Sequence, residues 1–287
     1  MVSLMAQFTN QARLAYNNSV TNSNIAIGEI LEVLSATKTA VRDEYAQNDS
    51  VAYIISIVNS GATAFSGLTI SDDLGSYAFG TDTLTPLTYV AGTLRYYVNG
   101  ILQTTPAVTA GPPLVISGIS IPAGGNVTLV YEAEVNQYAP LEATGLITNT
   151  ATISGGGITP IIVTETIGAL SEPLLTITKS VSPVPVTENG RLTYTFVIQN
   201  SGNMEAGAAS AAVITDIFDP ILTDLVVTFN GATWTEGPNY VYDPTTGSFT
   251  TVAGQITVPT ATFVQDPTTG VWLTNPGVST LVISGTV

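Results

Sequence analysis

The 287-residue chain contains no cysteine and no histidine, and only 6 of its residues are basic, against 21 that are acidic. Without these two residue types it has no disulfide, no thiol nucleophile, no histidine general base, and none of the usual ligands of zinc, copper or haem. The formal net charge of −15 argues against nucleic acid or an anionic membrane as a partner, because both require basic patches. We therefore expect a protein that is not an enzyme in the ordinary sense and that has no cofactor and no metal.

Long apolar runs are missing as well. No stretch approaches the roughly 18 apolar residues of a membrane-spanning helix, so we expect no membrane insertion. Residues 1–18 have neither a basic region nor an apolar core, so they do not resemble a signal peptide. Either a leader has been removed or the protein is made without one, and the sequence leaves both readings open.

The residues that are present predict an all-β chain. Short runs of alternating polar and apolar residues, such as 50–61 and 126–135, are separated by Gly, Pro, Asn and Asp. Such alternation buries one face of each strand and leaves the other to solvent, as in an antiparallel sandwich. Residues 29–37 and 209–222 are the best candidates for helix, but their β-branched content favours strands.

An internal repeat organises the chain. Lys38 is matched by Lys179, and Asp72 is matched by Asp216. The repeat predicts two tandem sandwiches, at 34–174 and 175–287, preceded by an arm and linker at 1–33. The matched segments are SATKTAV (35–41) with TITKSVS (176–182), VAYIISIVNSG (51–61) with LTYTFVIQNSG (192–202), TISDDL (69–74) with VITDIF (213–218), and GGNVTLVYEAEV (124–135) with PGVSTLVISGTV (276–287).

The two copies differ at their ends. The first continues through ITNTATISGGGITPIIVTETIGALSEP (147–173), whereas the second stops at Val287 without this segment. A counterpart of the segment lies at the other end of the chain, in residues 8–30, where Asn10 matches Asn149. We therefore expect the second sandwich to lack its last strand.

The N-terminal arm carries the residues that would supply that strand. A sandwich without a core strand exposes apolar surface and unpaired backbone groups, so we expect residues 6–17 of one molecule to complete the second sandwich of another. Head-to-tail contacts of this kind form an open filament when they do not close into a ring. The alternative is that the sequence simply stops short and the arm is a linker. The predicted donor-strand residues are Phe8, Thr9, Asn10, Ala12, Leu14 and Tyr16.

Residues 176–202 and ITNTATI (147–153) resemble a repeat domain of bacterial surface proteins, known as domain of unknown function eleven. The shared pattern is TK-x-V, then YTF-x-IQNSG, then a strand ending in Asp, and finally TNTAT. The first copy matches more loosely, since Ala36 and Thr39 depart from the commoner residues. The resemblance implies immunoglobulin-like sandwiches used as structural units, and it covers nearly the whole chain once the arm is counted.

Lys38 and Lys179 are the only lysines, and they occupy equivalent positions. This arrangement resembles the isopeptide-forming domains of Gram-positive pilins and collagen adhesins, in which a Lys amine attacks an Asn amide with the help of a buried carboxylate. The resemblance implies a Lys38–Asn149 bond within one molecule, assisted by Asp72.

The same resemblance implies a bond from Lys179 to Asn10 of the next molecule, assisted by Asp216. Glu132 and Glu134 rank lower as assisting carboxylates, because the second copy has Ser284 and Thr286 at their positions. The alternative is that the lysines only form salt bridges with the Asp residues.

We therefore predict a structural subunit of an extracellular filament on a cell or spore surface, with copies of itself as partners. The rival hypotheses are an adhesin or stalk module with a loop ligand site, and an S-layer or sheath component. A calcium site is a weaker hypothesis, since turn-forming Asp has no EF-hand spacing here. Its candidate ligands would be Asp72, Asp73, Asp216, Asp219 and Asp224.

Overall fold

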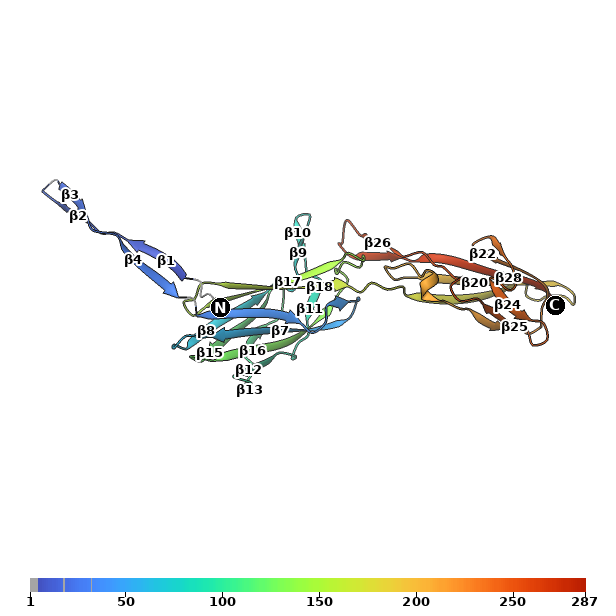
Figure 1. The fold of residues 1–287 in the computed structure, drawn as a ribbon, viewed down its shortest axis with the longest axis horizontal. Coiled ribbons are helices and arrows are strands. Elements are labelled where there is room, and N and C mark those ends of the chain that lie inside the picture. The colour runs from blue at the N-terminus through green and yellow to red at the C-terminus, as the bar shows by residue number, and fades with distance from the viewer. Residues whose placement is uncertain (1–4, 18, 32) are drawn as a thin grey trace. The chain divides into compact units, whose positions relative to one another are not determined.

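The computed structural model describes residues 5–17, 19–31 and 33–287, and this part of the chain is nearly all β-structure (Figure 1). Its one helical element is a single 3-10 turn, Ala208–Ser210. The chain forms two compact units. The first holds residues 1–43, 48–136 and 147–167, and the second holds residues 44–47, 137–146 and 168–287. The all-β prediction, with sandwiches in tandem, is confirmed.

Two six-stranded sheets build the first sandwich. In one sheet the order is β13-β12-β16-β7-β5, and β11 also pairs with β16. In the other the order is β14-β15-β8-β17-β18-β6. The strand bounds are β5 Leu34–Ala40, β6 Glu44–Tyr45, β7 Ser50–Asn59, β8 Phe65–Asp72, β11 Leu87–Tyr89, β12 Arg95–Val98, β13 Ile101–Leu102, β14 Ala107–Thr109, β15 Leu114–Ile121, β16 Asn126–Val135, β17 Leu146–Gly155 and β18 Ile161–Ala169. A separate hairpin consists of β9 Tyr77–Phe79 and β10 Asp82–Leu84.

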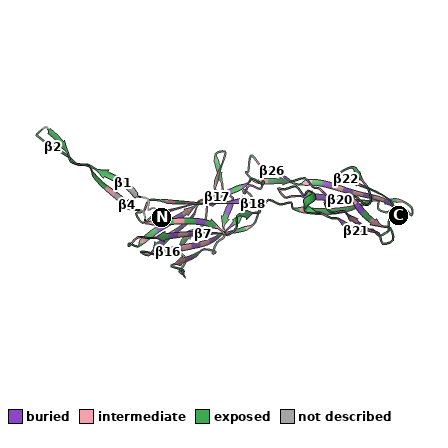
Figure 2. Cartoon of the chain, in the orientation of Figure 1, coloured by how far each residue is buried: buried purple, intermediate pink, exposed green. Residues whose placement is uncertain are grey.

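The core of this sandwich follows from the alternation along its strands. In β7 every second side chain is buried, including Tyr53, Ile55 and Ile57 (Figure 2). The other sheet contributes inward side chains such as Ile70 and Ile153, both with no exposed surface. Each such Ile contributes about 1.5–3 kcal/mol when it is removed from water.

The second sandwich pairs a five-stranded sheet, β19-β20-β28-β22-β23, with a three-stranded sheet, β21-β25-β24. Aromatic side chains fill its core, and the rings of Tyr194 and Phe218 stack with centroids 4.9 Å apart. The bounds are β19 Leu175–Ser182, β20 Arg191–Asn200, β21 Thr215–Ile217, β22 Thr223–Phe229, β23 Ala232–Trp234, β24 Tyr240–Asp243, β25 Ser248–Thr251 and β28 Gly277–Thr286. A further hairpin consists of β26 Thr262–Gln265 and β27 Trp272–Asn275.

Asn59 and Asn200 end the equivalent strands β7 and β20, and both are buried. The Nδ2 of Asn59 donates to the carbonyls of Thr63 and Pro122, and that of Asn200 donates to two carbonyls at the equivalent place. In both copies Oδ1 accepts from the backbone NH two residues later. The repeated NSG motif is therefore a strand end held by its Asn side chain.

The N-terminal arm is a two-part hairpin. β1 (Met5–Asn10) pairs with β4 (Ala26–Leu31), and β2 (Arg13–Tyr16) pairs with β3 (Ser19–Asn22). This differs from the predicted single strand over 6–17 followed by a linker, because the backbone groups of the arm find local partners in residues 19–31. Phe8 lies opposite Gly28, and its ring occupies the space where a Cβ of residue 28 would be.

The two segments in which helix competed with strand have different outcomes. Of residues 29–37, residues 29–31 lie in β4 and residues 34–37 lie in β5, so the strand prediction is confirmed for these residues. Within 209–222 only Thr215–Ile217 forms a strand, and Ser210 ends the 3-10 turn. The shortness of β21 has a physical reason: β25 is its only partner in the described part of the chain.

Candidate functional site: two lysine–aspartate pairs

Lys38 points into the first sandwich although it is charged. It lies on β5 opposite Ile55 of β7, on the inward side of the strand, and is 4% exposed. Its amine sits 5.2 Å from the centre of the Tyr53 ring. A buried lysine is costly unless it is paired, so its partner determines what it does.

That partner is Asp72, the last residue of β8 on the facing sheet. Lys38 Nζ donates to Asp72 Oδ2 over 2.7 Å, and neither side chain has any exposed surface. The second oxygen, Oδ1, accepts from the backbone NH of Leu74. The residue opposite Asp72 on β17 is Ala151, so the strand that follows β8 in the sheet covers this pair.

Tyr131 and Asn149 extend the pair into a buried network of four side chains. The Tyr131 hydroxyl donates to Asp72 Oδ2 over 2.5 Å, and Asn149 Nδ2 donates to the same hydroxyl over 3.3 Å. The Tyr131 hydroxyl uses its single proton in the bond to Asp72, so towards Asn149 it can only accept a hydrogen bond. It accepts from the amide NH2 group and cannot donate to the amide oxygen. Asn149 Oδ1 is buried without a hydrogen-bond partner among the described residues.

Burial sets the electrostatics of this network. It lowers the pKa of Lys38, and the neighbouring Asp72 opposes that shift. Burial and the Asp72 carboxylate together raise the pKa of Tyr131 well above its ordinary value. The tyrosine therefore stays a donor, and the lysine loses its proton more readily than a lysine in water. An amine, a carboxylate, a phenol and an amide meet here in a place closed to solvent.

The second copy has the same pair without the cover. Lys179 lies on β19 opposite Phe196, at the position equivalent to Lys38 opposite Ile55, and its amine bonds Asp216 of β21. The side chain of Lys179 is 39% exposed and that of Asp216 is 17% exposed, against none for the first pair. Three aromatic rings flank the amine, and the nearest, Tyr194, has its centre 4.4 Å away.

Tyr131 is the member of the site that the sequence analysis missed. It sits on β16 at an inward position of the alternating pattern, where a large side chain is normally read as core. The repeat held the signal that could have found it. The second copy has Ile283 at this position, so one copy has a phenol where the other has an aliphatic side chain.

The other predicted residues fall outside the network. Asn10 lies on the arm and is exposed, as are the large apolar donor-strand residues. Glu132 and Glu134 lie on the outer face of β16, where Ser50 donates to Glu132. No group of three or more acidic residues that could hold a metal ion occurs in the described ranges. The calcium hypothesis therefore has no supporting cluster of ligands within these ranges.

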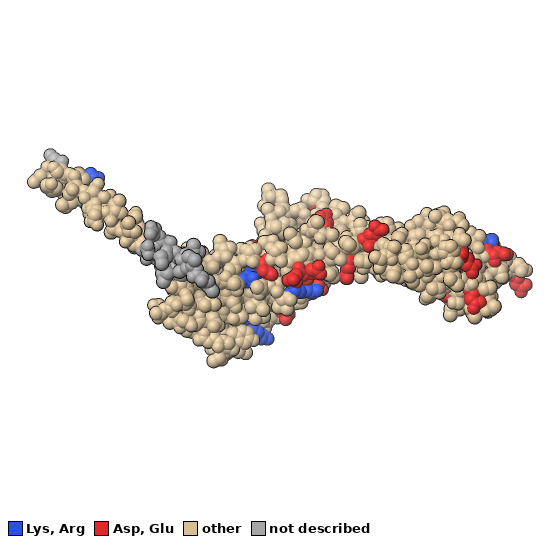
Figure 3. All heavy atoms as spheres, in the orientation of Figure 1, with Lys and Arg blue, Asp and Glu red and all other residues tan. Residues whose placement is uncertain are grey.

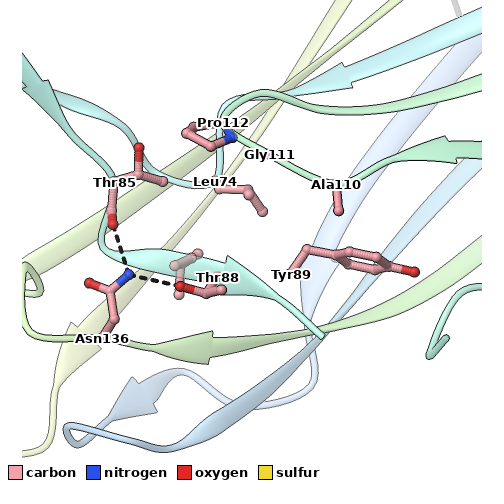
Figure 4. A pocket seen from close by; sticks show the side chains of 9 residues that line it. Leu74, Thr85, Thr88, Tyr89, Ala110, Gly111, Pro112 and Asn136 are labelled. Atoms are coloured by element: carbon pink, nitrogen blue, oxygen red, sulfur yellow. Dashed lines mark hydrogen bonds between the residues drawn. The ribbon is translucent and has the colours of Figure 1, made fainter. Parts of the chain in front are cut away.

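The described surface carries mostly acidic charge and shallow hollows (Figure 3). Acidic side chains are scattered over the visible face of both units, with few basic ones between them (Figure 3). A shallow hollow of about 360 Å³ in the first unit is lined by Thr88, Tyr89 and other uncharged residues (Figure 4). Asn136 there donates to the Thr85 carbonyl and to the Thr88 hydroxyl, so its amide protons are already used. Within the described ranges no helix is long and apolar enough to cross a membrane.

No family model and no curated protein matches the chain. The likeness to the bacterial surface repeat domain therefore remains a resemblance. Among solved structures, the major pilin subunit BcpA of Bacillus cereus, carrying D312A, is 9% identical, with 94% of this chain and 73% of that chain covered and a TM-score of 0.39.

The pilus backbone RrgB of Streptococcus pneumoniae is 12% identical over 85% of this chain and 55% of that chain, with a TM-score of 0.35. The collagen-binding domain of a Staphylococcus aureus adhesin is 12% identical over 48% of this chain and 97% of that chain, with a TM-score of 0.31. At these scores the likenesses carry no inference about function.

Proposed function

We propose that this chain is the structural subunit of a filament on a cell or spore surface, in which the arm of one copy completes the second sandwich of the next. A Lys–Asn isopeptide bond would lock each subunit internally, and a second bond would join neighbouring subunits. Apart from forming its own cross-links, the protein catalyses nothing.

The observation that carries this proposal is the contrast between the two lysine–aspartate pairs. In the first sandwich β17 supplies Asn149 and covers the pair, whereas β21 of the second sandwich pairs only with β25 within the described residues. The inward positions of β19 are open too, with Ile177 52% and Val181 41% exposed. An open sheet edge above exposed apolar side chains is an acceptor for an added strand.

The arm has the side chains that such an acceptor needs. Asn10 and Ala12 stand at the positions of Asn149 and Ala151, and Leu14 stands at that of Ile153. Asn149, Ala151 and Ile153 are all buried in the first sandwich, whereas Leu14 is 61% exposed in the arm. Burying these apolar side chains in a second copy supplies the driving force for assembly.

The proposed bond follows from the order of the four side chains in the first sandwich. Asp72 takes a proton from Lys38, and the neutral Nζ attacks Cγ of Asn149. The new C–N bond forms as the bond from Cγ to Nδ2 breaks. The first proton reaches Nδ2 from Asp72 by way of the Tyr131 hydroxyl, which already accepts a hydrogen bond from that nitrogen. Nζ then gives up a second proton to Asp72, where it stays, so that the new bond is a neutral amide. Ammonia leaves, so each bond lowers the mass by about 17 Da.

A denaturing gel combined with intact mass tests the proposal. Wild type is expected to give a ladder that survives boiling, and Lys179→Ala is expected to run as a monomer. Lys38→Ala is the matched control, because it should keep the ladder while each subunit retains the ammonia of its internal bond. Monomers of full mass from visible fibres would remove the bonds and keep the donated arm. Monomers without fibres under any condition would contradict the filament itself.

A further inference from the structure

The first sandwich closes the edge of β8 with two strands. β17 pairs directly with β8, and β18 lies outside it as the next strand of the sheet. Facing threonines mark the register of β17 and β18, since the hydroxyls of Thr148 and Thr166 are 3.1 Å apart and those of Thr150 and Thr164 are 3.5 Å apart. The segment of the first sandwich that has no counterpart within residues 175–287 is therefore a hairpin.

The arm is a hairpin with the same register. Thr9 of β1 lies opposite Ile27 of β4. Counted back by 139 positions, the offset from Asn149 to Asn10, Thr148 and Thr166 fall on Thr9 and Ile27, whereas the likeness of IAIGEI (25–30) to ETIGAL (165–170) has an offset of 140. With the offset of 139, the free arm pairs its strands as β17 and β18 are paired within the first sandwich.

The inward face of the arm is also matched. Ile147 precedes Thr148 and Ile167 follows Thr166, and both isoleucines are buried. In the arm the corresponding residues are Phe8 and Gly28, which face each other, and the Phe8 ring lies over the glycine. A large ring packed over a glycine covers a position in the sheet that has no side chain of its own. This is the composition of a core face, yet Phe8 is 52% exposed.

The outer edge of the hairpin is free to pair. In the described part of the chain β1 pairs only with β4, and β2 pairs only with β3. Insertion of β1 alone would break the bonds between β1 and β4 before new ones formed. Insertion of the whole hairpin keeps those bonds and adds new ones to β21.

We propose that the donated element is the entire hairpin of residues 5–31, with β1 and β2 taking the place of β17, and β3 and β4 that of β18, in the second sandwich of another copy. The register of β8 and β17 then places Ala12 opposite Asp216 and Arg13 opposite Thr215, since Ala151 faces Asp72 and Thr152 faces Ser71. Asn10 precedes Ala12 by two residues, as Asn149 precedes Ala151, so Asn10 takes the inward position of Asn149. This inference rests on the proposed filament and specifies which segment joins its subunits.

The absence of cysteine in the natural chain makes the test direct. Thr9→Cys combined with Ile27→Cys locks β1 to β4, because directly opposed antiparallel residues lie about 4.5–5.5 Å apart, within disulfide range. We expect the oxidised protein to assemble at a rate within about two-fold of the reduced protein, with fibres counted by electron microscopy. Assembly of the reduced protein alone would overturn the hairpin in favour of a single inserted strand. Failure of both forms and of wild type would instead overturn the filament, and the hairpin with it.

A second pair of variants tests the register. Arg13→Cys in one preparation and Thr215→Cys in another are mixed and oxidised, and we expect a disulfide-linked dimer of the two. Ala15→Cys is the control, displaced by two residues along β2, and is expected to cross-link to Thr215→Cys at least about ten-fold less. Equal cross-linking of the two arm variants would overturn the proposed register. A disulfide within one chain carrying both Arg13→Cys and Thr215→Cys, and none between chains, would overturn donation to another copy.

Discussion

The Tyr131 hydroxyl donates a 2.5 Å hydrogen bond to Asp72 Oδ2, the same oxygen that accepts from the Lys38 amine. The carboxylate therefore stands between an amine on one side and a phenol on the other, and the phenol in turn contacts the Asn149 amide. Such an order lets a proton pass from the nucleophile to the leaving nitrogen without entering solvent.

Tyr131→Phe is expected to slow the internal bond by about 100-fold, because it removes the hydroxyl that connects Asp72 to the leaving nitrogen. The measurement is the fraction of protein that has lost ammonia as a function of time after refolding, by intact mass. Tyr89→Phe is the control, since its ring packs against Tyr131 with centroids 6.3 Å apart but takes no part in the hydrogen-bonded network. An unchanged rate in Tyr131→Phe would show that the hydroxyl has no role in the transfer.

The two lysines should differ in what their loss costs. Lys38→Met leaves Asp72 buried beside a neutral side chain, so we expect the first unit to lose about 3–5 kcal/mol of stability relative to wild type that has not yet lost ammonia. Lys179→Met should cost less than about 1 kcal/mol in the unassembled subunit, because its pair with Asp216 is open to water. Hydrogen exchange read by mass spectrometry reports on each unit separately. Equal losses of stability in the two units would contradict the idea that burial of the Lys38–Asp72 pair, and exposure of the Lys179–Asp216 pair, set the cost.

The sequence predicted a strand correctly where residues alternate between polar and apolar and the strand pairs with a neighbour on both sides. The repeat aligns Lys38 with Lys179, and in both copies equivalent strands bring the lysine to its aspartate, whereas the Lys–Asn bonds stay a prediction. Tyr131 escaped because an inward aromatic residue fits a core equally well. The hairpin of the arm escaped because β3 and β4 are short, and their pairing depends on local contacts such as Phe8 over Gly28.

Asn59 and Asn200 provide a matched pair of stability predictions. Replacing either by Ala leaves two backbone carbonyls and one or more NH groups without their side-chain partners. We expect a loss of about 1–3 kcal/mol in the unit concerned, since buried groups left unpaired cost that much. Chemical denaturation of each single variant measures it, with the exposed Asn275→Ala as the control. A variant as stable as the control would show that water replaces the lost bonds.

The exposed turn at Asp243 predicts a pH effect confined to strong acid. Hydrogen bonds from Thr245 and Thr246 lower the pKa of Asp243 to about 2 from its ordinary value of 3.8. Because the folded pKa lies below the unfolded one, the stabilisation is complete above about pH 4 and is lost as the pH falls through 2. Asp243→Asn should therefore narrow the difference in Tm between pH 5 and pH 2 relative to wild type. If the variant and wild type lose the same Tm over that interval, the turn carboxylate contributes nothing to the acid sensitivity of the second unit.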